Sequence, residues 1–262
     1  MENRKKQISR YQLVTWIIGI LSLFLCLSLY VRFNKESILQ KLYPPLPEPV
    51  STPGTEEGKK GHWTNELPEE LTSRSSILLY VNEAHPLPAD YVPDDMSKIN
   101  IPSTGAAIEL RKEAGKKAQE MLKAAKEDDI DIYLTAGYRS YKNQEELYAS
   151  YVSLLGEARA SALVEKGGCS EHQTGLSIDI TNDPSGAQLN EEFADTDVYK
   201  WMSKNAYKYG YILRFPKGKK YITGLSFQPW HYRYVGTKTA KKMHKKDKNI
   251  TFEEYFGIYV EE

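Results

Sequence analysis

The sequence predicts an α+β domain that follows a single transmembrane helix and a flexible linker. An uncharged run close to the N-terminus is long enough to cross a bilayer, and a polar, proline-bearing segment follows it. The remainder mixes helical periods with alternating strand patterns and shows no regular βαβ repeat, which favours α+β. We assign a cytoplasmic basic tail to 1–12, the membrane anchor to 13–33, the flexible linker to 34–74 and the folded domain to 75–262.

The predicted anchor contains the uncharged run "VTWIIGILSLFLCLSLYV", from Val14 to Val31. As a helix rising about 1.5 Å per residue it spans about 27 Å, close to the bilayer core of about 30 Å. The basic residues of "MENRKKQISR" precede it, which places the N-terminus inside and the rest outside. A cleaved signal peptide is disfavoured because "VRFNKES" offers no small-x-small cleavage pattern. The other alternative is a buried helix of a soluble domain.

The predicted linker is polar, carries several prolines and has no apolar period, which is typical of a flexible stalk. His62 and Trp63 lie in it, and we expect both to be solvated. Cys26 and Cys169 are the two cysteines of the chain, so the outer part cannot form an internal disulfide. These features suit a bacterial cell-surface protein in a Gram-positive-like envelope.

Helix and strand patterns follow one another irregularly along the folded domain. Ile178 and Ile180 occupy alternate positions of one segment, as in a strand with one buried face. Ser140 is placed to cap a helix, and Thr251 with Glu254 forms a capping-box pattern before the last one. The predicted strands are 77–81, 129–134, 176–181, 211–215 and 229–235. The predicted helices before the last one are 104–129, 141–155, 157–166 and 196–210.

The charge of the chain is balanced. It contains 35 Lys and Arg and 35 Asp and Glu, so the composition argues against nucleic acid or another polyanion as a partner. The basic run "KTAKKMHKKDK", 238–248, is most simply the solvated face of a helix.

Two histidines and one aspartate form a candidate metal set. His172 lies in the loop "SEHQTG", Asp179 lies on the polar face of a predicted strand, and His231 lies on another. Such a set supplies three of the four tetrahedral positions of zinc and leaves one for water. The residues alone leave a second interpretation open, in which His231 is a hydrogen-bonded core histidine and Asp179 a surface carboxylate.

Five motifs of the folded domain resemble the VanY-type D-alanyl-D-alanine carboxypeptidases. In order, they are "VNEAHPLPADYVP", "GYRSYKNQEELY", "SEHQTGLSIDI", "GYILRFP" and "PWHYRYVG", and they extend over roughly 78–255. Enzymes of this type, and the related L,D-carboxypeptidases, are zinc peptidases that trim peptidoglycan stem peptides. The resemblance implies the fold shared by D,D-peptidases and hedgehog domains, a small antiparallel sheet flanked by helices, with one zinc.

The resemblance also assigns roles to individual residues. The ligands of Zn²⁺ would be His172, Asp179 and His231. The substrate-binding residues would be Arg139, Gln144 and Ser170. A carboxypeptidase must bind a free terminal carboxylate, and an arginine offers a planar pair of donors suited to it.

Gln228 departs from the family pattern, which has glutamate three residues before the last histidine. An amide can hold a water molecule by hydrogen bonds, but it cannot accept its proton at neutral pH. Losing a general base typically costs about 10²–10⁴-fold in rate. Three explanations remain: an engineered substitution that traps substrate, a natural variant with weak or no turnover, or another acid in place of the missing one. Glu171 is no evident substitute, because "SEHQTG" with that glutamate is ordinary in the family.

The sequence therefore predicts an extracytoplasmic, zinc-dependent carboxypeptidase that removes the C-terminal D-alanine of peptidoglycan stem peptides. We expect Gln228 to reduce or abolish that activity. The alternatives are an L,D-carboxypeptidase acting on tetrapeptide stems and a catalytically silent peptidoglycan-binding protein. The expected partners are the stem peptide and the membrane, and we expect a monomer.

Overall fold

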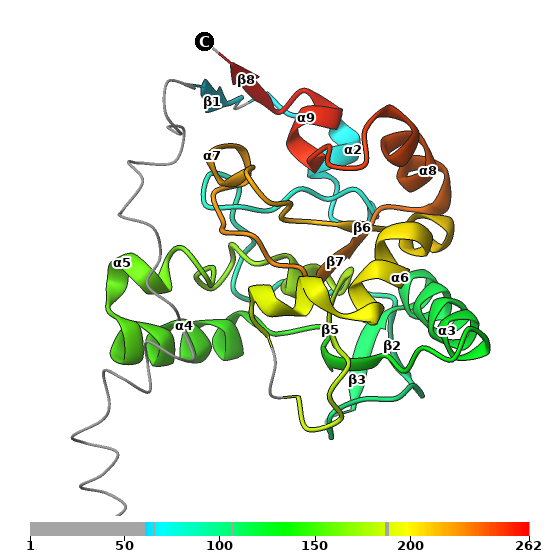
Figure 1. The fold of residues 1–262 in the computed structure, drawn as a ribbon. Helices are drawn as coiled ribbons and strands as arrows, with labels where there is room; N and C mark the ends of the chain where they lie inside the picture. The colour runs from blue at the N-terminus through cyan, green and yellow to red at the C-terminus, as the bar shows by residue number, and fades with distance from the viewer. Residues whose placement is uncertain (1–60, 65, 106, 187–188, 262) are drawn as a thin grey trace, which may run out of the picture. The chain divides into compact units, whose positions relative to one another are not determined.

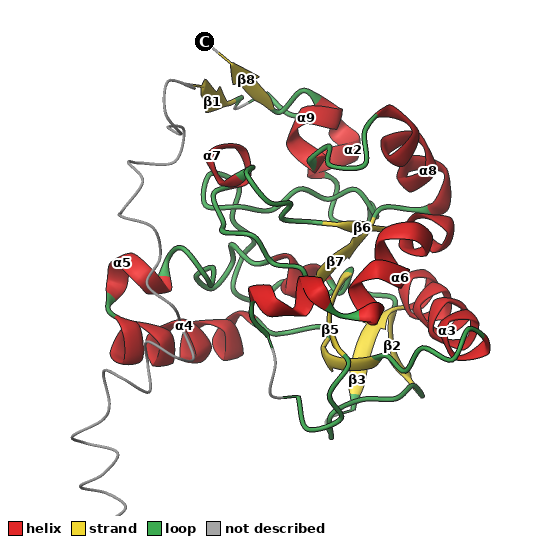
Figure 2. Cartoon of the chain, in the orientation of Figure 1, coloured by secondary structure: helices red, strands yellow, loops and turns green. Residues whose placement is uncertain are grey.

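The computed structural model describes residues 61–64, 66–105, 107–186 and 189–261 (Figure 1). The predicted basic tail 1–12 and membrane anchor 13–33 lie outside these residues, as does the predicted linker up to residue 60. Within the described ranges, no helix combines the length and the apolar content that crossing a membrane requires. The described part confirms the α+β prediction, with small antiparallel sheets and separate helices (Figure 2).

A four-stranded antiparallel sheet lies at the centre of the fold, in the order β4-β5-β7-β6. Its strands are β4 (Tyr133–Ala136), β5 (Ser177–Thr181), β6 (Tyr211–Leu213) and β7 (His231–Tyr234). Ile178, Ile180 and Tyr232 are buried in the main hydrophobic core on one side of this sheet. The alternate residues Asp179 and His231 therefore face the other side, as the period of two predicts.

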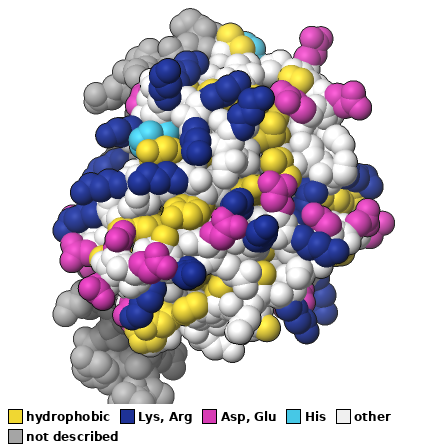
Figure 3. All heavy atoms as spheres, turned by 90° about the vertical axis from the view of Figure 1, so that its right-hand side faces the viewer, with side chains coloured by type: hydrophobic (Ala, Val, Ile, Leu, Met, Phe, Trp, Pro, Cys, Tyr) yellow, Lys and Arg dark blue, Asp and Glu magenta, His cyan; other side chains and the backbone are white. Residues whose placement is uncertain are grey.

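Helices surround this sheet. In Figure 1, α4 (Tyr141–Leu155) and α5 (Glu157–Ala160) lie to the left of it, and α3 (Lys112–Glu127), α6 (Asp197–Asn205) and α8 (Thr237–Lys246) lie to the right. The buried face of α3 is a stripe of small and apolar residues that packs into the main core. Figure 3 views the side that carries α3 and α8, and shows Lys and Arg spread over the surface with Asp and Glu among them.

The folded domain begins earlier than predicted. β1 (Gly61–Trp63) pairs with β8 (Tyr259–Glu261), and α2 (Glu69–Thr72) buries Leu71 completely. The indole Nε1 of Trp63 donates a hydrogen bond of 2.6 Å to the carbonyl of Ile222. Trp63 is thus bound into the domain, so its assignment to a solvated linker is wrong.

Two further predictions of secondary structure are corrected. The helix predicted from residue 104 begins at Lys112, because 108–111 form β3 (Ile108–Arg111), which pairs with β2 (Met96–Ile99). The segment 77–81 is buried from Leu79 onward but forms no regular strand. Its carbonyls at Ile77 and Leu79 accept hydrogen bonds of 3.1 and 2.9 Å from the guanidinium of Arg233.

The predicted caps are present. The Oγ of Ser140 accepts a hydrogen bond of 3.3 Å from the backbone N–H of Asn143 at the start of α4, and Thr251 with Glu254 forms the capping box of α9. α5 ends at Ala160, and the rest of the predicted helix, 161–166, is a turn followed by irregular backbone. The remaining elements are α7 (Lys220–Thr223), α9 (Phe252–Phe256), and the 3-10 helices η1 (Glu171–Thr174), η2 (Glu191–Asp195) and η3 (Ala206–Tyr209).

Candidate metal centre

Strand pairing brings the three predicted metal ligands together. Asp179 on β5 and His231 on β7 are register partners, so their side chains leave the sheet side by side. His172 comes from η1, the short helix directly before β5. Gly175 ends η1 in the left-handed conformation (φ 65°), which turns the chain back into the strand.

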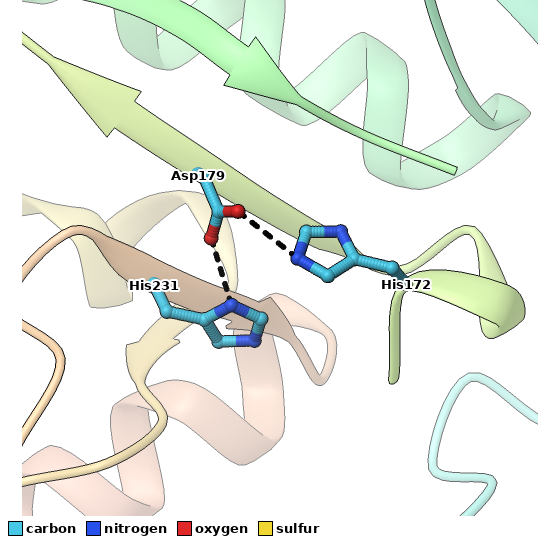
Figure 4. Close-up of side chains that lie close together, drawn as sticks. All are labelled: His172, Asp179 and His231. Carbon is cyan, nitrogen blue, oxygen red and sulfur yellow. Dashed lines mark hydrogen bonds and ion pairs between the residues drawn. The ribbon is translucent and has the colours of Figure 1, made fainter. Parts of the chain in front are cut away.

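The two oxygens of Asp179 each face one imidazole (Figure 4). Oδ1 lies 2.8 Å from Nδ1 of His231, and Oδ2 lies 3.1 Å from Nε2 of His172. One candidate ligand atom from each residue falls within 4.8 Å of the others, and all three side chains are buried. A tetrahedral zinc with bonds of about 2.0–2.2 Å keeps its ligand atoms about 3.4 Å apart, so small side-chain shifts complete the set.

The hydrogen bonds of His172 fix which nitrogen carries its proton. Nδ1 lies 2.7 Å from the carbonyl of Gly137, which can only accept, so Nδ1 donates and Nε2 presents its lone pair to Asp179. Burial lowers the pKa of His172, which favours the neutral ring. Burial would raise the pKa of Asp179, but His172 and His231 outweigh it and lower that pKa. A lone pair facing a carboxylate repels it unless a cation lies between them. The donor set therefore fits Zn²⁺.

The pKa of His231 shifts in the opposite direction to that of His172. Burial alone would lower its pKa, but Asp179 and Glu171 raise it to about 9. Its Nε2 is buried, lies 3.9 Å from Oε2 of Glu171 and makes no hydrogen bond within the described residues. If Nδ1 binds the metal, Nε2–H points towards this second carboxylate, as in the carboxylate–histidine–metal arrangement.

Glu171 is held by two buried arginines. Its Oε1 lies 2.8 Å from Nε of Arg214 and 3.0 Å from Nη1 of Arg233. Arg214 forms a second ion pair, in which its Nη2 lies 2.6 Å from Oε1 of Glu253. Burial would raise the pKa of Glu171, but the two guanidinium groups lower it well below its usual range. Neither arginine is among the site residues that the sequence predicts. Arg233 lies two residues after His231 on one strand, a spacing that places both on the same face.

Arg139 lies beside Asp179, one of the predicted metal ligands, and binds Gln144. Nη1 of Arg139 donates a hydrogen bond of 2.8 Å to Oε1 of Gln144, and Nη2 lies 3.9 Å from Oδ2 of Asp179. Nε2 of Gln144 donates a hydrogen bond of 2.6 Å to the backbone carbonyl of Glu165. Arg139 also lines a groove of about 440 Å³ between β4 and α4. Its guanidinium is therefore placed between the candidate centre and open surface.

Ser170 and Gln228 complete the predicted set. Ser170 is buried, and its Oγ has no hydrogen-bond partner within the described residues. Gln228 is also buried, and its Nε2 donates a hydrogen bond of 3.1 Å to the carbonyl of Leu163. The backbone carbonyl of Gln228 accepts a hydrogen bond of 3.2 Å from the N–H of His231. The side-chain amide of Gln228 is thus held by its own donor group, and it lacks a proton acceptor with the strength of a carboxylate.

Comparison with known proteins places the chain in one family. Residues 107–237 match the family described as "VanY: D-alanyl-D-alanine carboxypeptidase". A D-alanyl-D-alanine carboxypeptidase of Enterococcus faecalis is 31% identical over 96% of this chain and 92% of its own length.

Solved structures agree with this match. The LdcB LD-carboxypeptidase is 41% identical, with a TM-score of 0.65 over 71% of this chain and 87% of that one. A mutant of the vancomycin-resistance D,D-pentapeptidase VanY in complex with Zn(II) is 31% identical, with a TM-score of 0.55 over 70% of this chain and 99% of that one. The fold, the site geometry and these comparisons agree: the chain belongs to the VanY family of D-alanyl-D-alanine carboxypeptidases.

Proposed function

We propose that the chain is a zinc-dependent carboxypeptidase that removes the C-terminal D-alanine of peptidoglycan stem peptides. The observation that carries this proposal is the convergence of His172, Asp179 and His231 beside Arg139. Two histidines and a carboxylate match a catalytic zinc site with an open position, and a relative of this family has been solved with Zn(II). When bound, zinc polarises the scissile carbonyl and lowers the pKa of a bound water to about 7.

The remaining residues of the centre have roles in substrate binding. Arg139 keeps guanidinium donors that Gln144 does not use, and these suit the terminal carboxylate of a peptide. The hydroxyl of Ser170 is buried and has no hydrogen-bond partner in the described part of the chain, which suits the binding of a peptide carbonyl. Both groups orient the peptide, and neither transfers a proton.

We propose that the domain acts outside the cytoplasmic membrane. The uncharged run from Val14 to Val31 and the basic residues before it support a single-pass anchor with the domain on the outer side. Peptidoglycan lies on that side, so this orientation places the domain next to its substrate. A monomer remains our expectation.

Two other functions have specific support. The LdcB LD-carboxypeptidase supports cleavage of an L,D bond at the tetrapeptide stage. Gln228 supports a silent protein that binds peptidoglycan without cleaving it, because the amide cannot act as a base.

The release of D-alanine by the full chain, purified in mild detergent and loaded with zinc, separates these functions. We expect release from a pentapeptide ending in D-Ala-D-Ala, and none after His172→Ala, which removes a ligand. Faster release from the tetrapeptide would assign the L,D activity. Zinc-dependent peptide binding without release from either peptide would identify a binding protein.

A further inference from the structure

Eight exposed lysines lie on α6, η3 and α8 or directly after α8. We call them the basic face: Lys204, Lys208, Lys238, Lys241, Lys242, Lys245, Lys246 and Lys248. Five of them are on α8, whose other face buries Ala240 and Met243 in the domain. Figure 3 views the side that carries α8, and few Asp or Glu lie among the Lys and Arg of its upper left part.

A contact between η3 and α8 brings these lysines together. The rings of Tyr207 on η3 and His244 on α8 stack with their centroids 3.7 Å apart. Lys208 follows Tyr207 in the chain, and Lys241 lies one helical turn before His244. Lysines from two elements therefore flank one stacked pair of rings.

The charges of the basic face are uncompensated within the described residues. None of its lysines forms an ion pair there, whereas Lys117 and Lys219 elsewhere in the domain do. Nζ of Lys208 donates a hydrogen bond of 2.6 Å to Oδ1 of Asn205, which is a neutral group. The balanced charge of the whole chain hides this local excess, because residues 237–250 contain six lysines and one aspartate.

The helix dipole accounts for part of this pattern only. The negative end of α8 attracts cations to its last turn, which contains Lys245 and Lys246. Lys238 lies in the first turn, where the dipole repels a cation, and Lys204 and Lys208 belong to other elements. Like charges held together without partners therefore point to an anionic ligand.

The chemistry of the face favours one class of polyanion. Its cations are all lysines, and an ammonium group binds a phosphate as a point charge, without the planar geometry of arginine. The exposed large hydrophobics of the described residues, Val92, Leu154 and Val260, lie on other segments, whereas a helix that enters a lipid surface exposes apolar side chains. Nucleic-acid bases stack on free aromatic rings, but Tyr207 is stacked with His244. The face therefore fits a flexible, water-borne polymer of phosphates.

A cavity of about 180 Å³ lies between η3 and α8 within the basic face. Its lining includes Tyr207, His244 and Lys248. One water molecule occupies about 30 Å³ in the liquid, so the cavity has room for about six, or for one small polyol unit. Tyr232 of β7 also lines the cavity, and its buried Oη has no hydrogen-bond partner among the described residues. A ligand that carries hydroxyl groups suits this lining.

We propose that the basic face binds a linear anionic polymer of polyol phosphate units. The lysines hold the phosphates, and the cavity takes one polyol unit. Tyr232 and His231 are successive residues of β7, so their side chains leave opposite faces of the sheet. The polymer therefore binds across the sheet from the candidate metal centre and leaves that centre open. This binding does not depend on the proposed peptidase function.

Calorimetry of the full chain with a short poly(glycerol phosphate), in non-ionic detergent at several salt concentrations, tests the proposal. We expect the logarithm of the association constant to fall linearly with the logarithm of the salt concentration, because bound lysines release counterions. The triple variant Lys241→Gln, Lys245→Gln and Lys248→Gln lowers the affinity about 10- to 100-fold at low salt and reduces the salt slope by about two to three.

A matched triple variant removes the same charge from exposed lysines outside the basic face: Lys116→Gln, Lys123→Gln and Lys142→Gln, on α3 and α4. We expect it to bind the polymer as the natural chain does. Equal losses in both triple variants would show that net charge alone drives binding and would overturn the proposal. An absence of binding by the natural chain would overturn it as well.

Lysine acetylation distinguishes the polymer from other sources of phosphate. In the full chain inserted into bilayer discs, we expect the added polymer to slow acetylation of the basic face. A change of lipid from phosphatidylcholine to phosphatidylglycerol, without polymer, leaves that rate unchanged. Slowing by phosphatidylglycerol alone would assign the face to lipid headgroups. Displacement of the polymer by single-stranded DNA at a lower phosphate concentration would assign it to nucleic acid. Either result would overturn the proposal.

The release of D-alanine separates this proposal from the peptidase function. We expect the triple variant of the basic face to act on a soluble pentapeptide at the rate of the natural chain, because its lysines lie away from the candidate centre. A joint loss of polymer binding and release would indicate a damaged fold and overturn the proposal. If neither chain releases D-alanine while the natural chain binds the polymer, the peptidase function fails and the polymer site stands.

Discussion

His231 carries a proton that zinc has to displace. Its pKa of about 9 lies above neutrality, so the metal-free centre is protonated there at pH 7. We expect zinc binding at pH 7 to release about one proton and to strengthen as the pH rises towards 9. Calorimetry in buffers of different ionisation enthalpy measures the release. Equal heats in all buffers would show that His231 is already neutral.

Arg139 is the residue whose loss weakens recognition of the peptide terminus. A lysine keeps the charge but loses the planar pair of donors, so we expect Arg139→Lys to lower kcat/KM about 10- to 100-fold, mainly through KM. Steady-state kinetics on the cleaved peptide measures the change. Arg159→Lys changes an arginine on α5 and serves as the control. An equal loss in both variants would indicate a general effect on folding.

At the residue scale, the motifs predicted which side chains meet, and the structure places them together. His172, Asp179 and His231 converge because strand register and one tight turn bring them together. Their roles as ligands stay predictions. The ion pairs of Glu171 with Arg214 and Arg233 carry no such signal, because these residues are distant from it in sequence and meet it only in the folded chain.

The ion pairs of Arg214 join three elements behind the centre. Arg214 follows β6 and binds Glu171 of η1 and Glu253 of α9, with all three side chains buried. Removing one partner of a buried pair leaves the other charge unpaired, so we expect Arg214→Met to lower the free energy of unfolding by about 3–5 kcal/mol. Denaturant unfolding measures this change.

A second ion pair, between Lys219 and Glu254, provides the control for Arg214→Met. Nζ of Lys219 lies 2.6 Å from Oε1 of Glu254, but both side chains are partly exposed to water. We expect Lys219→Met to change the free energy of unfolding by less than about 1 kcal/mol. Similar losses in Lys219→Met and Arg214→Met would show that burial does not set the strength of these pairs.

Among the elements, sequence periods predicted most of the central strands and helices but not their ends. α3 begins late because β3 pairs with β2 before it, and a pairing partner distant in sequence leaves no mark on the local pattern. Residues 77–81 have the composition of a strand, but Arg233 occupies two of their carbonyls. The caps at Ser140 and Thr251 were predictable because each depends on residues within one turn.

The whole domain includes the residues from 61 onward. A chain that begins at residue 75 lacks β1, α2 and the buried Leu71, and it exposes the surfaces that they cover. The loss of one buried leucine side chain alone costs about 2–5 kcal/mol. We therefore expect a chain beginning at 75 to melt well below one beginning at 61. Calorimetry of both chains measures this, and equal melting temperatures would show that 61–74 add no stability.

The pairing of β1 with β8 also has a mechanical consequence. Gly61 lies opposite Glu261 at the edge of the domain, so a pull on the chain before residue 61 is received first by this short ladder. Antiparallel strands pulled from one end separate one hydrogen-bonded pair at a time, which takes less force than shearing the whole ladder at once. We therefore expect β1 to separate from β8 under tension before the load reaches the central sheet and the three residues of the candidate metal centre.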